Sequence, residues 1–197
     1  MTDVQMSGLS HAQQVELLSA GGATLVQLRE KQMPAREFYE HARAAVEVAR
    51  RSGVTLIVND RVDIALAANA HGVHLGQDDM PPDAARQLLG DEAIIGYSTH
   101  NIEQATKALS LPIDYLAVGP IFATSTKTDT SPVLGLDGLR AVRNAIGAVP
   151  LVAIGGISLA NAREVIEAGA DSVALISALL SDPRYISEKI SALIRGL

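Results

Sequence analysis

The feature that most constrains this chain is a regular alternation of short apolar runs and longer segments of helical composition. Each run is rich in β-branched residues or Leu and is followed by a polar turn. Such alternation is typical of parallel β-sheets whose strands are connected by helices. Seven runs predict strands, at Thr24 to Leu28, Thr55 to Asn59, Val73 to Leu75, Ile94 to Tyr97, Tyr115 to Val118, Leu151 to Ile154 and Ser172 to Ile176.

The intervals around these runs predict helices, because they are rich in Ala, Leu, Glu, Gln and Arg. Several of them end at a glycine, such as Gly53 or Gly169, which can adopt the left-handed conformation that turns the chain back. The predicted helices are His11 to Ala20, Ala35 to Arg51, Val62 to Asn69, Pro82 to Leu89, Ile102 to Leu109, Leu136 to Ile146 and Leu159 to Ala168.

This alternation fits either an open doubly wound sheet or a closed barrel of eight strands. Seven strands are one short of closure, and His11 to Ala20 has the character of a first crossover helix. The missing strand should therefore end near Met1 to Asp3. We interpret residues 1–197 as one α/β domain, a TIM (β/α)8 barrel whose first strand is truncated at the N-terminus. Its functional residues should follow the carboxyl ends of the strands.

Composition excludes several classes of function. The 197 residues include no Cys, so disulfides, thiolate metal sites and a cysteine nucleophile are absent. Sixteen basic and 22 acidic side chains give a formal charge of -6 without a basic run, which argues against nucleic-acid or membrane partners. The N-terminus shows no signal-peptide pattern, so we expect a cytoplasmic protein.

Two cations and an amide lie at the end of the first predicted strand. The period of two along a strand places Gln27, Arg29 and Lys31 on one face, away from Leu28 and Glu30. A salt-bridged strand end would explain this cluster as well as an anion site would. Inward cations at a barrel mouth are costly without an anion, which favours phosphate recognition.

Two aspartates follow the next two strands of the series. Asp60 comes directly after Asn59, and Asp79 lies four residues beyond Leu75. Each of them, taken singly, could cap the helix that follows. Mg²⁺ prefers a few carboxylate oxygens together with water and substrate phosphate, so the pair near the cations suggests a diphosphate held through metal.

Polar or glycine-rich loops follow the remaining strands. Ser98 carries a hydroxyl that could donate to phosphate, and residues 124–127 offer two Thr hydroxyls and Lys127, although a solvated loop has the same composition. Gly155-Gly156 allows close backbone approach to an anion but is also common in tight turns. His71, His74 and His100 lack metal-ligand spacing, and we expect them to be structural or exposed.

Taken in order, seven motifs closely resemble the thiamine-phosphate synthase family from Gly21 onward. They are QLREK, VNDR, GVHLGQDD, GYSTH, GPIFATSTK, AIGGI and LIS. The resemblance implies a TIM barrel and a transferase that joins hydroxymethylpyrimidine diphosphate to thiazole phosphate, releasing diphosphate and forming thiamine phosphate. It also implies a dissociative reaction in which diphosphate leaves first and the thiazole nitrogen captures the pyrimidine-methyl cation.

The resemblance also implies a role for individual residues. The pyrimidine diphosphate would be bound by Gln27, Leu28, Arg29, Glu30, Lys31, Asn59, Ser98 and Lys127. Mg²⁺ would be bound by Asp60 and Asp79, and the thiazole phosphate by Thr124, Ser125, Thr126, Gly156, Ile176 and Ser177. The groups acting in catalysis would be Arg29, Lys31, Ser98 and Lys127.

Two other functions share this fold. A thiazole tautomerase resembles the synthase but is expected to carry a His after the glycine that ends the strand before the Thr loop, where this chain has Pro120. A non-catalytic sensor of phosphate ligands could keep the same barrel. The paired aspartates favour the synthase over both alternatives.

Overall fold

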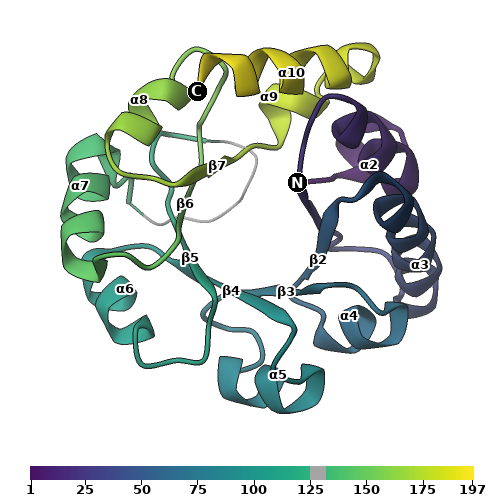
Figure 1. The fold of residues 1–197 in the computed structure, drawn as a ribbon, viewed down its shortest axis with the longest axis horizontal. Helices are drawn as coiled ribbons and strands as arrows, with labels where there is room; N and C mark the ends of the chain where they lie inside the picture. The colour runs from purple at the N-terminus through teal and green to yellow at the C-terminus, as the bar shows by residue number, and fades with distance from the viewer. Residues whose placement is uncertain (125–131) are drawn as a thin grey trace.

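The computed structural model describes residues 1–124 and 132–197. In these residues seven parallel strands form one sheet in sequence order. They are β1 (Leu25–Leu28), β2 (Thr55–Asn59), β3 (Gly72–Leu75), β4 (Ile94–Thr99), β5 (Tyr115–Val118), β6 (Leu151–Ile154) and β7 (Ser172–Ala174). The sheet curls so that its strands surround a central axis, with helices outside (Figure 1), as in TIM-like folds.

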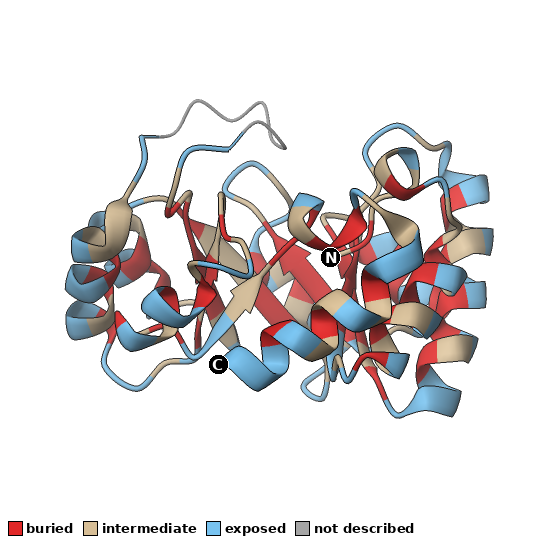
Figure 2. Cartoon of the chain, turned by 90° about the horizontal axis from the view of Figure 1, so that it is seen from above, coloured by how far each residue is buried: buried red, intermediate tan, exposed pale blue. Residues whose placement is uncertain are grey.

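Helices connect successive strands and cover the outer face of the sheet (Figure 1). The described helices are α1 (Val4–Ser7), α2 (His11–Ala20), α3 (Ala35–Ser52), α4 (Val62–Ala68), α5 (Pro82–Leu89), α6 (Ile102–Ala108), α7 (Gly135–Ile146), α8 (Ala162–Glu167), α9 (Ser177–Leu180) and α10 (Ile186–Gly196), with a 3₁₀ turn at Pro183–Tyr185. Figure 2 shows their inward sides buried and their outward sides exposed.

Strands such as β2 and β3 are buried on both faces, which explains why they are continuous apolar runs rather than alternating ones. β3 is buried along its whole length, and β2 is buried apart from its first residue. Leu28, Leu56, Leu75, Leu116 and Leu151 are all fully buried. The core therefore follows the curled sheet around, and the polar residues lie either in the loops at the strand ends or at a few buried strand positions such as Asn59 and His74.

The predicted element types agree with the structure, but some boundaries were wrong. β4 continues through Ser98 to Thr99, and β7 ends at Ala174 rather than Ile176. α8 begins at Ala162 rather than Leu159, because Asn161 Oδ1 accepts the Ser158 N–H at 2.7 Å and turns the chain first.

The first two residues bridge the two ends of the sheet without forming an eighth strand. The amino group of Met1 donates to the Leu175 carbonyl oxygen at 3.0 Å, and the Thr2 N–H donates to the Gln27 carbonyl oxygen at 2.9 Å. An interior cavity of about 280 Å³ lies between β1, β7 and α10. The described residues therefore form the seven strands predicted from the sequence, with Met1 and Thr2 hydrogen bonded across the gap where an eighth strand would lie.

Across residues 1–124 and 132–197, none of the helices combines the length and the apolar character that crossing a bilayer requires.

Candidate active site

Among the described residues, the charged side chains selected from the sequence lie at the carboxyl ends of β1 to β3. The two cations that follow β1 each contact a carboxylate. Arg29 Nη1 lies 3.2 Å from Asp3 Oδ2, and both side chains are mostly buried. Lys31 Nζ donates to Asp60 Oδ2. The cation cluster is therefore balanced by acidic groups, one from the N-terminal segment and one from the end of β2.

The three remaining residues of the first motif point elsewhere. Leu28 is fully buried in the core. Gln27 is 8% exposed and lines the interior cavity, while Glu30 turns its carboxylate back onto the following backbone. The predicted shared face for Gln27, Arg29 and Lys31 is thus only partly realised, because β1 ends at Leu28 and the chain leaves the strand geometry there.

Asp60 and Asp79 lie close to each other, and neither caps a helix. The N-cap residues of α4 and α5 are Arg61 and Pro81, which removes the capping interpretation. Asp60 has φ of 63°, a left-handed conformation that few non-glycine residues adopt and that is frequent at functional sites. Asp79 Oδ2 accepts the Gly76 N–H at 2.7 Å.

The electrostatics of this pair indicate that the two carboxylates repel each other. Burial raises the pKa of Asp79, the Gly76 N–H opposes that rise, and the adjacent Asp60 raises it further. A cation between them would relieve this repulsion. Within the described part of the chain no group of three or more His, Asp or Glu side chains could hold a metal ion, so the pair would share Mg²⁺ with water and substrate oxygens.

A buried polar chain connects β3, β4 and β5. His74 Nδ1 lies 2.8 Å from the Tyr115 hydroxyl, and His74 Nε2 lies 2.8 Å from Ser98 Oγ. Burial raises the pKa of Tyr115 above its usual range, although the neighbouring Gln27 opposes the rise. Tyr115 therefore stays a neutral hydroxyl that orients His74, and His74 in turn orients Ser98.

Sequence reasoning missed the contact that His74 makes. It treated His71, His74 and His100 alike, and two of them do have structural contacts: His71 Nδ1 accepts the Leu56 N–H, and His100 Nδ1 lies 2.8 Å from the Gly119 carbonyl oxygen. His74 is different, because it contacts a predicted site residue. The available signal was its position: His74 lies inside the predicted strand Val73 to Leu75, where a polar side chain must find a buried partner.

A second cavity of about 480 Å³ opens at the ends of β4 to β7. It brings together five residues that the sequence assigned to substrates: Ser98, Thr124, Gly156, Ile176 and Ser177. Their elements are far apart in sequence, and the curled sheet places them around one hollow. Asn59 is not among them and lines the interior cavity beside Gln27. Ser125, Thr126 and Lys127 lie outside the described residues.

Gly156 is required where the backbone approaches the preceding loop. Its φ is 66°, and a Cβ there would lie 2.7 Å from the Ala123 carbonyl oxygen and 2.7 Å from Phe122 Cβ. The left-handed conformation and the close approach both exclude a side chain. The second cavity is therefore shaped by the backbone and by small residues.

Comparisons with known proteins point in one direction. A family model described as thiamine monophosphate synthase matches residues 1–179. A thiamine-phosphate synthase from Chloroflexus aurantiacus is 49% identical over 197 residues, covering 98% of this chain and 90% of that protein. One from Vibrio campbellii is 44% identical, covering 99% and 96%. A solved thiamine phosphate pyrophosphorylase from Pyrococcus furiosus has a TM-score of 0.89 at 36% identity, covering 98% of this chain and 91% of that one.

Proposed function

The chain belongs to the thiamine monophosphate synthase family, and from that premise we propose that it joins hydroxymethylpyrimidine diphosphate to thiazole phosphate. It is a transferase of the thiamine-phosphate synthase type. The observation that carries the proposed reaction is the pairing of Asp60 and Asp79 beside Lys31, next to a separate cavity for a second substrate.

We assign the charged residues at the ends of β1 to β3, Arg29 and Lys31, to binding of the pyrimidine diphosphate. Arg29 and Lys31 would exchange their contacts with Asp3 and Asp60 for diphosphate oxygens, which are better matched in charge. Lys127 is assigned to the same group from the resemblance and stays a prediction. Because negative charge builds up on the departing diphosphate, these cations would stabilise the transition state more than the ground state.

Mg²⁺ fits the residues present. Asp60 and Asp79 supply hard oxygen ligands, and their mutual repulsion favours a cation between them. The bound ion would supply additional positive charge for the leaving diphosphate. In the free protein Lys31 Nζ donates to Asp60, and it becomes available for diphosphate once that carboxylate has another cationic partner.

The buried hydrogen bonds among Tyr115, His74 and Ser98, together with the second cavity, would position the two substrates. Gln27 and Asn59 line the interior beside Tyr115, where amide groups could bind a pyrimidine ring. Ser98 lies between this interior and the second cavity, held by His74. The hydroxyls of Thr124 and Ser177 and the backbone at Gly156 would hold the thiazole phosphate.

The mechanism we propose is dissociative and needs no protein nucleophile. The carbon–oxygen bond to diphosphate breaks with its electron pair leaving on oxygen, and the thiazole nitrogen lone pair then forms the new bond to the pyrimidine-methyl carbon. The protein contributes charge stabilisation on one side and positioning of the nucleophile on the other.

We further propose that the curled sheet is a (β/α)8 barrel with one domain over 1–197 and that the enzyme acts in the cytoplasm. Met1 and Thr2 support the barrel, because they hydrogen bond to both neighbours of the eighth strand position. Adding about five to eight apolar residues, roughly one strand, before Met1 should raise thermal stability and reduce light scattering. Equal melting temperatures would count against a vacant strand position.

The deciding experiment is an assay of the purified chain with both phosphorylated substrates and Mg²⁺. We expect thiamine phosphate and diphosphate in equal amounts, with no product when either substrate or the metal is omitted. Isomerisation of the thiazole phosphate alone would support the tautomerase instead, although Pro120 stands where that activity is expected to need a His. Tight binding of either ligand without turnover would support the sensor.

A further inference from the structure

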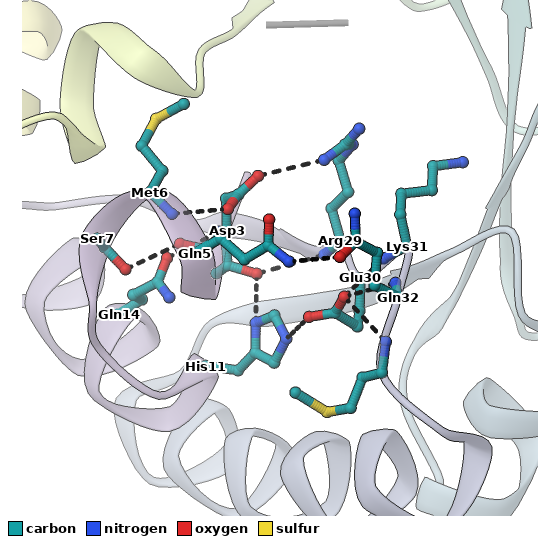
Figure 3. Close-up of polar contacts among 12 residues, drawn as sticks. Asp3, Gln5, Met6, Ser7, His11, Gln14, Arg29, Glu30, Lys31 and Gln32 are labelled. Atoms are coloured by element: carbon teal, nitrogen blue, oxygen red, sulfur yellow. Dashed lines mark hydrogen bonds and ion pairs between the residues drawn. The ribbon is translucent and has the colours of Figure 1, made fainter.

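A buried histidine outside the site connects the N-terminal segment to the loop that carries Arg29 and Lys31. His11, the first residue of α2, is 0% exposed. Its Nδ1 lies 2.7 Å from Thr2 Oγ1, and its Nε2 lies 3.9 Å from Glu30 Oε2 (Figure 3). Nothing in the proposed reaction uses His11 directly, yet a buried polar ring in this position needs an explanation.

The Glu30 carboxylate accepts hydrogen bonds from the backbone of the loop that follows it. Its Oε1 accepts the backbone N–H groups of Lys31, Gln32 and Met33 at 2.8, 2.9 and 3.3 Å. Burial raises the pKa of Glu30, but these three N–H groups and the nearby His11 outweigh that effect, so its pKa lies below the usual value and the group is a carboxylate at neutral pH. One carboxylate therefore holds the three amides that follow it in a single turn.

The hydrogen bonds around Thr2 indicate which nitrogen of His11 carries the proton. Thr2 Oγ1 accepts the Arg29 N–H at 3.3 Å, and its own proton can reach the Gln27 carbonyl oxygen at 3.4 Å or His11 Nδ1 at 2.7 Å. The much shorter contact favours donation to His11 Nδ1. The proton of the neutral ring is then on Nε2, facing Glu30. The opposite tautomer would turn a lone pair toward an ionised carboxylate and is disfavoured.

The contact between His11 and Glu30 is electrostatic rather than a hydrogen bond, since 3.9 Å exceeds hydrogen-bond length. His11 Nε2 is buried and has no hydrogen-bond partner within the residues that the structure describes, so the Glu30 carboxylate is the charged group that it faces. The low local dielectric strengthens the attraction between an N–H dipole and a carboxylate.

The N-terminal segment is itself held firmly, so Thr2 is a stable anchor. Asp3 Oδ1 accepts the Met6 N–H at 3.0 Å, and the Asp3 N–H donates to Gln14 Oε1 at 2.9 Å. Arg29 contacts the other oxygen of Asp3. Thr2, His11 and Glu30 therefore connect this anchor to both sides of the loop, through the Arg29 amide on one side and the amide of Lys31 on the other.

We propose that His11 is a positioning residue for the transferase reaction: acting through Glu30, it holds the 29–33 loop in the conformation that directs Lys31 to Asp60 and the diphosphate. This inference rests on the proposed function, because it assigns the diphosphate to Lys31. It extends that function to a residue which contacts neither substrate, and it explains why Glu30 faces away from the site although it lies in the first motif.

The test compares two substitutions that keep different halves of the histidine. His11→Asn keeps an acceptor near Thr2 but loses the N–H toward Glu30, whereas His11→Gln can place an amide N–H near the Nε2 position. We expect His11→Asn to lower kcat/KM for the pyrimidine diphosphate about tenfold, with the KM for thiazole phosphate changed less than about twofold. His11→Gln should recover most of the loss.

Two control variants keep the proposal testable if His11→Asn folds poorly. His41 lies edge-on to the His11 ring at 5.9 Å, so His41→Asn perturbs the same packing while leaving Thr2, His11 and Glu30 in place. It should behave as the wild type does. Thr2→Val removes the hydroxyl that orients the His11 ring, and it should show the same selective loss as His11→Asn to a smaller extent.

A second readout does not depend on activity. Hydrogen exchange of the Lys31, Gln32 and Met33 amides should be about tenfold faster in His11→Asn than in the wild type and restored in His11→Gln. Unchanged exchange and kinetics in folded His11→Asn, or equal loss in the His11→Asn and His41→Asn proteins, would overturn the positioning role. An inactive wild type would instead overturn the proposed function, while the exchange comparison would still decide the role of His11.

Discussion

The two halves of the site differ in the groups that line them. The half near β1 to β3 consists of long charged side chains that are already paired, with Arg29 on Asp3 and Lys31 on Asp60. The half near β5 to β7 is a cavity shaped by the backbone at Gly156 and by small side chains such as Ser177.

This difference matches the charges that each half is proposed to bind. A diphosphate with a metal ion carries several charges, and more negative charge develops on it as it leaves. Arg29 and Lys31 can stabilise that charge by exchanging their carboxylate partners for diphosphate oxygens. A monophosphate that only has to be held can be bound by hydroxyls and backbone amides, which need no counter-ion when empty. The following experiments test whether the halves act separately, from the largest expected effect to the smallest.

The largest effect should come from the metal pair. Asp79→Ala should lower turnover by about 100-fold or more, because it removes one of the two carboxylates that we propose bind Mg²⁺. The measurement is a Mg²⁺ titration of the reaction rate alongside a thermal melt. Asp78→Ala is the matched control, since this neighbouring carboxylate is exposed. Full activity in a folded Asp79→Ala protein would remove the metal assignment.

In the half near β5 to β7, adding a single methyl group at Gly156 should lower stability and weaken thiazole phosphate binding. Gly156→Ala would force a residue at φ of 66° against Ala123 and Phe122. We expect a loss of roughly 1–3 kcal/mol in stability and a KM for thiazole phosphate raised about tenfold, with little change for the pyrimidine diphosphate. Gly53→Ala has nearly the same φ, 67°, in the left-handed region and open space around its Cβ, so it measures the backbone strain alone. Equal kinetic effects on both substrates would contradict the separation of the halves.

Between the two halves, the position of Ser98 should depend on its contact with His74. His74→Phe removes the partner of Ser98 Oγ and should slow the reaction about fivefold to tenfold, with both substrates affected, because Ser98 lies between them. Tyr115→Phe removes only the hydroxyl on the far side of His74 and should have a smaller effect. Steady-state kinetics with each substrate varied in turn would measure this, and a change confined to one substrate would place Ser98 in a single half.

The smallest effect at neutral pH is that of His11 protonation on stability. Burial lowers its pKa from 6.5 to about 4, so the folded protein keeps it neutral while the unfolded chain takes up a proton as the pH falls below 6.5. Stability is unaffected above that pH and declines as the pH falls from 6.5 toward 4, by roughly 3 kcal/mol at about 1.36 kcal/mol per pKa unit. Denaturant unfolding across this range should show a weaker pH dependence in His11→Asn. Parallel curves for the two proteins would rule out His11 as the source.

The sequence by itself determined the repeating strand and helix units, since buried parallel strands must be apolar runs and their connections must be helical. It also placed Asp60, Asp79 and Lys31 at strand ends, which the curled sheet does bring together. The resemblance supplied the roles of the second cavity, whose residues come from four strand ends and share no local pattern.

Only the tertiary structure decided the contacts that depend on packing between distant segments. The approach of His11 to Glu30 depends on α2 and the N-terminal segment, neither of which is encoded near QLREK. His74 gained its partners from β4 and β5, and Arg29 gained Asp3 from the first residues of the chain. A strand-end residue has several allowed rotamers, and the neighbours that select one of them are brought close only when the sheet curls.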